Sequence, residues 1–143
     1  MSDIKLHILL VEDDIAMQRM VSRILKGEGC TLEIAHNSRE ALDALKRNTF
    51  DLVLMDMKMA AMWGTKTTKI IRTGNGGSNC LDIPIIALTS FPEEEAREQC
   101  ITAGMNGFLK KPFQMDNFLR ELKTIISNGK SFSPGLSHDE NER

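Results

Sequence analysis

The sequence lacks long apolar runs, a marked excess of charge and a secretory leader. No stretch approaches the roughly 20 apolar residues of a membrane-spanning helix, so we expect no membrane insertion. The formal net charge of −2 provides no strongly basic surface, and direct binding of nucleic acid is therefore not predicted. The N-terminal residues MSDIKLHILLVEDD have neither a basic lead nor a small-residue cleavage site, and so predict no signal peptide.

Cysteine is scarce as well. The sequence contains three cysteines, Cys30, Cys80 and Cys100, and no two of them form a CxxC pair. An odd and scattered set fits neither a disulfide framework nor a zinc site, and we therefore expect a reduced, cytoplasmic protein.

The chain has the size and composition of one globular domain. It has 143 residues, of which 41% are apolar and 27% are charged. We expect this domain to occupy residues 1–128. Residues 129–143 show no apolar periodicity, which predicts a disordered tail or linker.

Short apolar segments alternate with segments of helical periodicity. Five segments resemble strands, at residues 6–11, 31–35, 50–55, 83–88 and 108–109. The run LVLM at 52–55 has no polar interruption, which is typical of a strand covered on both faces, as in a parallel sheet.

Helices are expected after the strands. In the first, apolar residues within 17–25 recur at spacings of three and four, and Gly27 and Gly29 are expected to end the helix. Asn37 predicts the N-cap of the second helix, and Glu40 is expected to complete a capping box.

Three further helices follow. The third is predicted at 65–73, ahead of a loop, GNGGSN, at 74–79; the fourth is predicted at 93–103, and the last carries an apolar stripe between 115 and 126. The inward positions of the third helix are predicted to be Thr67, Ile70 and Ile71.

Five strand–helix units with short connections predict a parallel sheet covered by helices on both faces. Functional groups of such sheets gather beyond the carboxyl ends of the strands. Polar residues do stand after four of the strands, and they are Glu12, Asp13, Asp14, Asp56, Thr89, Ser90, Lys110 and Lys111. We expect them to converge at one edge of the sheet.

Asp56 directly follows the apolar run, where an uncompensated carboxylate is costly. Crowded carboxylates raise one another's pKa or gather a hard cation, and Mg²⁺ suits oxygen ligands and phosphate. A carboxylate also acts as a nucleophile toward a phosphoryl group, whose oxygens a cation, a lysine and a threonine can bind. These residues therefore predict phosphoryl transfer to an aspartate.

Four pieces of the sequence, in this order and spacing, resemble a receiver domain of two-component signalling. They are LLVEDD, LVLMDMKM with the later Gly64, IIALTS and FLKKPF. The resemblance implies a flavodoxin-like, doubly wound α/β fold with five parallel strands in the order 2-1-3-4-5 and helices on both faces. The pieces IIALTS and AGMNGFLKKPF resemble receivers of hybrid sensor kinases most, although single-domain receivers share them.

The resemblance also assigns roles to residues. Asp56 is the implied phosphoacceptor, and Thr89 and Lys111 are implied to bind the phosphoryl group. Thr89 and Phe108 are the implied switch residues, whose rearrangement would relay or report phosphorylation.

The implied cofactor is Mg²⁺, held by Glu12, Asp13, Asp56 and the backbone carbonyl of Lys58. The implied partner is a sensor histidine kinase or a histidine phosphotransfer protein, which donates a phosphoryl group from a phosphohistidine. The chain is then expected to be a signalling phosphoacceptor and not an enzyme.

Two other function classes stay open. An aspartyl-phosphate phosphatase of the same general fold usually has DxDx[TV] after the first strand, where this sequence has EDDIA. A binding module that has lost phosphorylation is expected to lack an acid, the threonine or the lysine, and none of these is missing.

Neighbours of the site have alternative interpretations. Asp14 is either a third acid or a cap at the helix start, and Ser90 either lines the site or begins a loop. Lys110 is expected to be an exposed neighbour of Lys111.

The loop after Asp56 departs from the family's frequent pattern. Ala60 stands where a proline is frequent, and Trp63 stands where an aspartate is frequent. The resemblance also implies that the side chains of Lys58 and Phe91 overhang the phosphoryl group, and we expect them to slow its hydrolysis. The alternative is that Phe91 packs into the core and Lys58 lies in solvent.

Overall fold

The computed structural model describes residues 5–60, 62–74 and 81–127. The expected loop at 74–79, apart from its first residue, and the expected tail at 129–143 lie outside the described residues, so both stay predictions. Within the described ranges, no helix combines the length and the apolar character needed to cross a bilayer.

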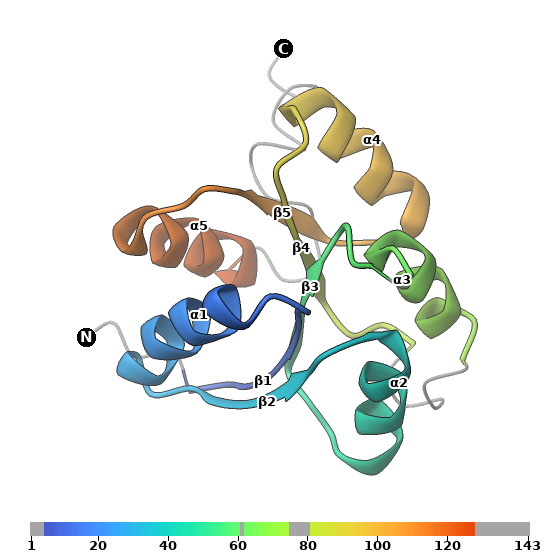
Figure 1. Ribbon diagram of the computed structural model, residues 1–143, viewed down its shortest axis with the longest axis horizontal. Helices are drawn as coiled ribbons and strands as arrows, with labels where there is room; N and C mark the ends of the chain where they lie inside the picture. The colour runs from blue at the N-terminus through green and yellow to red at the C-terminus, as the bar shows by residue number, and fades with distance from the viewer. Residues whose placement is uncertain (1–4, 61, 75–80, 128–143) are drawn as a thin grey trace.

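Five parallel strands form one sheet at the centre of Figure 1. Their order across the sheet is β2-β1-β3-β4-β5, which confirms the predicted topology. The strands are β1 (His7–Val11), β2 (Thr31–Ala35), β3 (Leu52–Asp56), β4 (Ile85–Thr89) and β5 (Gly107–Lys110). β2 has its predicted bounds, and the others are shifted by a residue or two at their ends.

Helices cover both faces of the sheet, as predicted (Figure 1). They are α1 (Ile15–Gly27), α2 (Ser38–Arg47), α3 (Gly64–Arg72), α4 (Glu93–Ala103) and α5 (Met115–Ser127). Residues of α1 and α5 pack on one face, and residues of α2, α3 and α4 pack on the other.

The central strands supply both layers of the core, because successive side chains of a strand point to opposite faces. Leu54 of β3 packs with Leu25 and Phe118 on the α1 and α5 side, whereas Val53 and Met55 pack on the other side. Every residue of β3 and of β4 is buried. Since a fully buried apolar side chain contributes about 1.5–3 kcal/mol relative to an exposed one, these strands anchor the fold.

The end of α1 and the start of α2 differ in detail from the predictions made from sequence. Gly27 is still inside α1, and the left-handed turn after the helix is at Gly29, with φ of 95°. The side chain of Asn37 accepts a hydrogen bond from the N–H of Glu40 at 2.9 Å, as a capping box requires. The carboxylate of Glu40, however, accepts from the N–H of His36 at 2.8 Å and not from that of Asn37.

The inward face of α3 is more polar than predicted. Gly64, Thr67, Thr68 and Ile71 are buried, whereas Ile70 is only half-buried. These four buried positions have the i, i+3, i+4, i+7 spacing of one helix face, and this face packs inward. The hydroxyl of Thr67 lies 2.5 Å from that of Ser38, which makes a buried polar link between α2 and α3.

Gly64 places the start of α3 directly against the end of β3. Its N–H donates to the carbonyl of Met57 at 2.8 Å. A Cβ at this position would lie 2.3 Å from the carbonyl oxygen of Asp56 and 2.7 Å from Cγ of Met55. Only glycine therefore allows the helix to approach the Asp56 backbone this closely.

We predict that Gly64→Ala lowers the free energy of unfolding by about 1–3 kcal/mol, because the added methyl group overlaps with backbone. Chemical denaturation measures the change. The matched control is Gly27→Ala within α1, where nothing lies within 4 Å of the added Cβ. There the same exchange is expected to raise the free energy of unfolding by about 0.5–1 kcal/mol. Effects of the same sign at both positions would contradict the close approach at Gly64.

Candidate functional site

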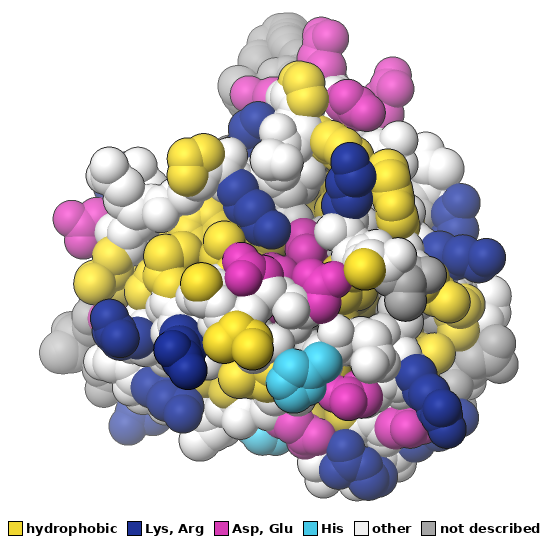
Figure 2. Space-filling view, viewed as in Figure 1, with side chains coloured by type: hydrophobic (Ala, Val, Ile, Leu, Met, Phe, Trp, Pro, Cys, Tyr) yellow, Lys and Arg dark blue, Asp and Glu magenta, His cyan; other side chains and the backbone are white. Residues whose placement is uncertain are grey.

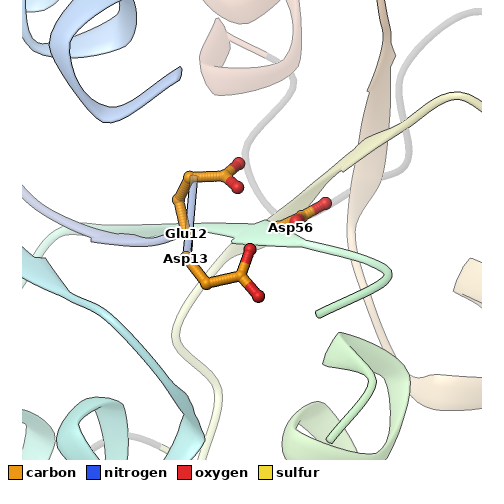
Figure 3. Close-up of side chains that lie close together, drawn as sticks. All are labelled: Glu12, Asp13 and Asp56. Atoms are coloured by element: carbon orange, nitrogen blue, oxygen red, sulfur yellow. The ribbon is translucent and has the colours of Figure 1, made fainter. Parts of the chain in front are cut away.

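Three carboxylates meet at the carboxyl edge of the sheet. Glu12 and Asp13 directly follow β1, and Asp56 is the last residue of β3. The register of these neighbouring strands pairs Val11 with Met55, so Glu12 and Asp56 come next at the same edge (Figure 3). One carboxylate oxygen from each of Glu12, Asp13 and Asp56 lies within 4.8 Å of the others. The predicted convergence of these acids is therefore found.

Glu12 is held in place by backbone contacts on several sides. Its N–H donates to the carbonyl of Ala35 at 3.0 Å, and its carbonyl accepts from Nε2 of Gln18 at 2.6 Å. Oε2 accepts from the N–H of Asp14 at 3.1 Å. Oε1 is buried and accepts no hydrogen bond from any residue that the structure describes. That oxygen is an unused ligand atom inside the acidic cluster.

Among the described residues, the ammonium of Lys111 forms ion pairs with this cluster. Nζ of Lys111 lies 3.0 Å from Oδ1 of Asp56 and 3.7 Å from Oε1 of Glu12. Burial, and after it the negative charge of Asp56, raise the pKa of the Glu12 carboxyl to about 7, although Lys111 acts in the opposite direction. In Figure 2, acidic side chains gather in the middle of the face that shows the strand ends in Figure 1. The cluster thus carries more negative charge than its lysine balances.

The donor set fits a hard divalent cation. It consists of three carboxylates, and one of their oxygens is buried without a hydrogen-bond donor in the described part of the chain. Mg²⁺ prefers oxygen ligands and commonly binds through one or two carboxylates. The backbone N–H of Lys58 lies 3.4 Å from Oδ1 of Asp56. The carbonyl of Lys58, which was predicted to be a metal ligand, is therefore in a loop that begins beside this cluster.

Asp13 also connects the cluster to the loop after β3. The carboxylate is exposed, and its Oδ2 accepts a hydrogen bond from the N–H of Ala60 at 3.0 Å. Proline has no N–H, so a proline at position 60 would remove this bond. The departure from the family's pattern at Ala60 therefore has a visible consequence for the loop.

Thr89 ends β4, and Lys111 directly follows the neighbouring strand β5. Thr89 is the buried last residue of β4, and its carbonyl accepts from the N–H of Lys111 at 2.7 Å. Its hydroxyl accepts from the N–H of Phe91 at 3.0 Å. The structure thus places the predicted threonine and lysine at the same edge as Asp56.

The remaining residues considered from sequence are Phe108, Asp14 and Ser90. Phe108 lies in the core, 7% exposed, in the cluster that also contains residues of α4. Asp14 is the N-cap of α1, because its Oδ1 accepts from the N–H of Ala16 at 3.2 Å. Ser90 is exposed. The interpretation of Asp14 as a helix cap is therefore confirmed.

The contacts of two polar residues differ from, or were absent from, the predictions made from sequence. Lys110 was expected to be an exposed neighbour, but it is half-buried and its ammonium donates to the carbonyl of Phe91. Gln18 is only 6% exposed, although it is polar, because its amide binds the carbonyl of Glu12. A glutamine on the apolar stripe of the first helix was the available signal for this contact.

Trp63 contacts both residues that were expected to overhang the phosphoryl group. The Lys58 ammonium lies 5.5 Å from the centroid of the Trp63 ring. The rings of Trp63 and Phe91 are 5.8 Å apart, with an angle of 44° between their planes. Phe91 is half-buried and packs against the core, whereas the Lys58 side chain is exposed. No hydrogen bond or ion pair among the described residues joins either side chain to Asp56, so the expected overhang stays a prediction.

Comparison with known proteins agrees with this geometry. The family model of the response regulator receiver domain matches residues 8–123. Hybrid signal transduction histidine kinase B of Dictyostelium discoideum is 35% identical over 124 residues, which cover 80% of this chain and 6% of that protein. Transcriptional regulatory protein ZraR of Escherichia coli (strain K12) is 31% identical over 123 residues, which cover 86% of this chain and 27% of that protein. The chain thus spans a small part of these curated relatives.

A similar solved structure is the receiver domain of sensor histidine kinase PA1611 from Pseudomonas aeruginosa PAO1. It has a TM-score of 0.75 and 32% identity, and the match covers 87% of this chain and 99% of that one. That domain is described with a magnesium ion coordinated in its active site cleft. The family match extends over most of the sequence and agrees with the strand order and the acidic edge. This chain belongs to the response regulator receiver domain family of two-component signalling.

Proposed function

We propose that this chain accepts a phosphoryl group on Asp56 from a phosphohistidine and signals through the resulting change in conformation. The observation that supports the proposal is the convergence of Asp56 with Glu12, Asp13 and Lys111 at one edge of the sheet. In this role the chain is a signalling phosphoacceptor and not an enzyme with a turnover of its own. The phosphatase and the inert binding module are the alternatives.

The transfer needs a nucleophile and groups that bind the phosphoryl oxygens. A carboxylate oxygen of Asp56 attacks phosphorus, the P–N bond of the phosphohistidine breaks, and the electron pair returns to the imidazole nitrogen. The hydrogen bonds from Lys58 N–H and Lys111 Nζ both end on Oδ1 of Asp56, so Oδ2 is the oxygen that takes part in neither. Lys111 and the hydroxyl of Thr89 would bind the new phosphoryl oxygens.

Mg²⁺ is the cofactor that we propose for the acidic cluster. Glu12, Asp13 and Asp56 would hold the ion, together with the backbone carbonyl of Lys58. When bound, the ion supplies positive charge that lowers the repulsion between the carboxylates and an incoming phosphoryl group. The magnesium ion in the similar receiver domain of PA1611 supports this assignment.

The donor would be a sensor histidine kinase or a histidine phosphotransfer protein in the cytoplasm. This proposal follows from the relatives, which include a hybrid histidine kinase and a transcriptional regulatory protein. Phosphorylation of Asp56 would shift an existing equilibrium between two conformations of the chain. We expect the loop after β4 to rearrange, because the N–H of its residue Phe91 donates to the hydroxyl of Thr89. We expect Phe108 to rearrange with this loop.

Incubation with acetyl phosphate and Mg²⁺, followed by intact mass measurement, tests the proposal. We expect one phosphate on the wild-type chain and none on Asp56→Asn, because an amide has nearly the same shape but is a poor nucleophile. Asp43→Asn, at an exposed acid of α2, is the control that should retain the phosphate. Rapid multiple turnover would favour the phosphatase, and a wild-type chain without an adduct would favour the inert module. A full level of phosphate on Asp56→Asn would move the acceptor elsewhere.

Mg²⁺ is expected to stabilise the protein, because the carboxylates that repel one another in the fold are separated in the unfolded chain. An ion that binds only the folded state adds roughly 1.4 kcal/mol at ten times its Kd, which raises the melting temperature by about 3–6 °C. Thermal unfolding with and without about 10 mM Mg²⁺ measures this shift.

Asp13→Asn should strongly reduce the Mg²⁺-dependent shift. The matched control is Asp14→Asn, because Asp14 caps α1 and asparagine is an equally good N-cap. This control is expected to keep the full shift. A wild-type melting temperature that does not respond to Mg²⁺ would argue against the acidic cluster as a cation site.

Lys111→Ala is expected to take up phosphate but to lose the conformational response. Lys111 is bound both to Asp56 through Nζ and to Thr89 through its N–H, and the variant removes only the first of these bonds. Hydrogen exchange of the loop after β4, with and without acetyl phosphate, measures the response. Lys46→Ala, at an exposed lysine of α2, is the control. A normal response of Lys111→Ala would show that Lys111 is not the coupling residue.

A further inference from the structure

Trp63 is an exposed aromatic residue with contacts on two sides. It is 41% exposed and directly precedes α3, without a side-chain capping bond. One contact is with the ammonium of Lys58, from the loop after β3, and the other is with the ring of Phe91, from the loop after β4. The indole thus joins the two loops next to the acceptor while much of its own surface stays exposed, and burial of apolar surface alone does not explain this position.

The backbone of Trp63 is fixed relative to Asp56. Its carbonyl accepts from the N–H of Lys66 at 3.0 Å and from the N–H of Thr67 at 3.2 Å, in the first turn of α3. The next residue, Gly64, is held against Asp56 by the close approach described above. The indole therefore starts from a defined position near the acceptor.

The two partners of Trp63 are connected to the acceptor and to the phosphoryl-binding hydroxyl. The N–H of Lys58 lies 3.4 Å from Oδ1 of Asp56. The N–H of Phe91 donates to the hydroxyl of Thr89 at 3.0 Å, and the carbonyl of Phe91 accepts from Lys110. Trp63 thus links Lys58 to Phe91 and completes a series of contacts that runs from Asp56 to Thr89.

We propose that Trp63 is a positioning residue that holds Lys58 and Phe91 beside phosphorylated Asp56 and so limits the access of water. The inference rests on the proposed function. In the hydrolysis that it slows, a water oxygen attacks phosphorus and the bond from phosphorus to the Asp56 oxygen breaks. The carboxylate leaves with the electron pair, and the water gives up a proton as inorganic phosphate forms. Phe91 has no group that can orient this water, and an ammonium held over the indole has less freedom to move away.

The lifetime of the aspartyl phosphate tests the proposal. After phosphorylation by acetyl phosphate and removal of the donor, we expect Trp63→Ala to lose phosphate about threefold to tenfold faster than wild type, as loss of one aromatic pair and one cation–π contact suggests. Trp63→Phe keeps a ring and should restore most of the lifetime. Ile101→Ala, at a residue of α4 that is 53% exposed, is the control and should match wild type.

A combined variant separates positioning from a general loss of structure. If Trp63 acts through its two partners, Trp63→Ala should cause no further acceleration in a chain that already carries Lys58→Ala and Phe91→Ala. The same acceleration in that background would overturn the proposal, as would an unchanged lifetime in Trp63→Ala alone. A wild-type chain that takes up no phosphate would instead overturn the proposed function, and this inference with it; that result is distinct because no adduct forms at all.

Fluorescence provides a second measurement that does not need phosphate. The sequence has one tryptophan, so the emission reports Trp63 alone. Lys58→Ala and Phe91→Ala should each make this emission easier to quench with acrylamide, whereas Ile101→Ala should not. Quenching that is unchanged in both of the first two variants would show that the contacts do not hold the indole, and would overturn the proposal.

Discussion

Repulsion among three carboxylates at one edge of the sheet is the constraint on which the site depends. Glu12, Asp13 and Asp56 are brought together because β1 and β3 are paired in register, and the core residues of those strands hold that register. Lys111 supplies one compensating charge. Burial, and after it the charge of Asp56, raise the pKa of Glu12. Crowded carboxylates also attract cations, which accounts for the fit of a hard divalent ion. The stability of the apolar core thus maintains an arrangement that is electrostatically unfavourable in itself.

The rigid sheet and the loops at its edge have different roles. β3 and β4 are buried throughout, so the positions of Asp56 and Thr89 are set by packing. The loops that follow them are joined to the site by a few hydrogen bonds, among them Ala60 N–H to Asp13 and Phe91 N–H to the Thr89 hydroxyl. Under the proposed function, a new charge at Asp56 would alter these contacts directly, whereas the core would change little because it is close-packed. This division is what the proposed function requires if a local chemical event is to move a surface.

The departures from the family's frequent pattern lie in the loop after β3, and each makes a specific contact. Ala60 donates a hydrogen bond that a proline could not donate, and Trp63 joins Lys58 to Phe91 where a shorter acidic side chain would offer no ring. Gly64, in contrast, follows the pattern, and its close approach to Asp56 explains why a side chain is not accommodated there.

The sequence by itself determined the alternation of strands and helices, because apolar spacing and end signals are local properties. β2 and α4 have their predicted bounds, and the rule that polar residues gather at the carboxyl ends of parallel strands was enough to bring Asp56 together with Glu12 and Lys111. The tertiary structure alone decided which side chains meet across elements: the amide of Gln18 on Glu12, the ammonium of Lys110 on Phe91, and the buried hydroxyls of Ser38 and Thr67. These contacts join residues of different elements or fix a loop, and they depend on how helices and loops pack over the sheet. Periodicity along one segment carries no information about the side chains that another segment places against it.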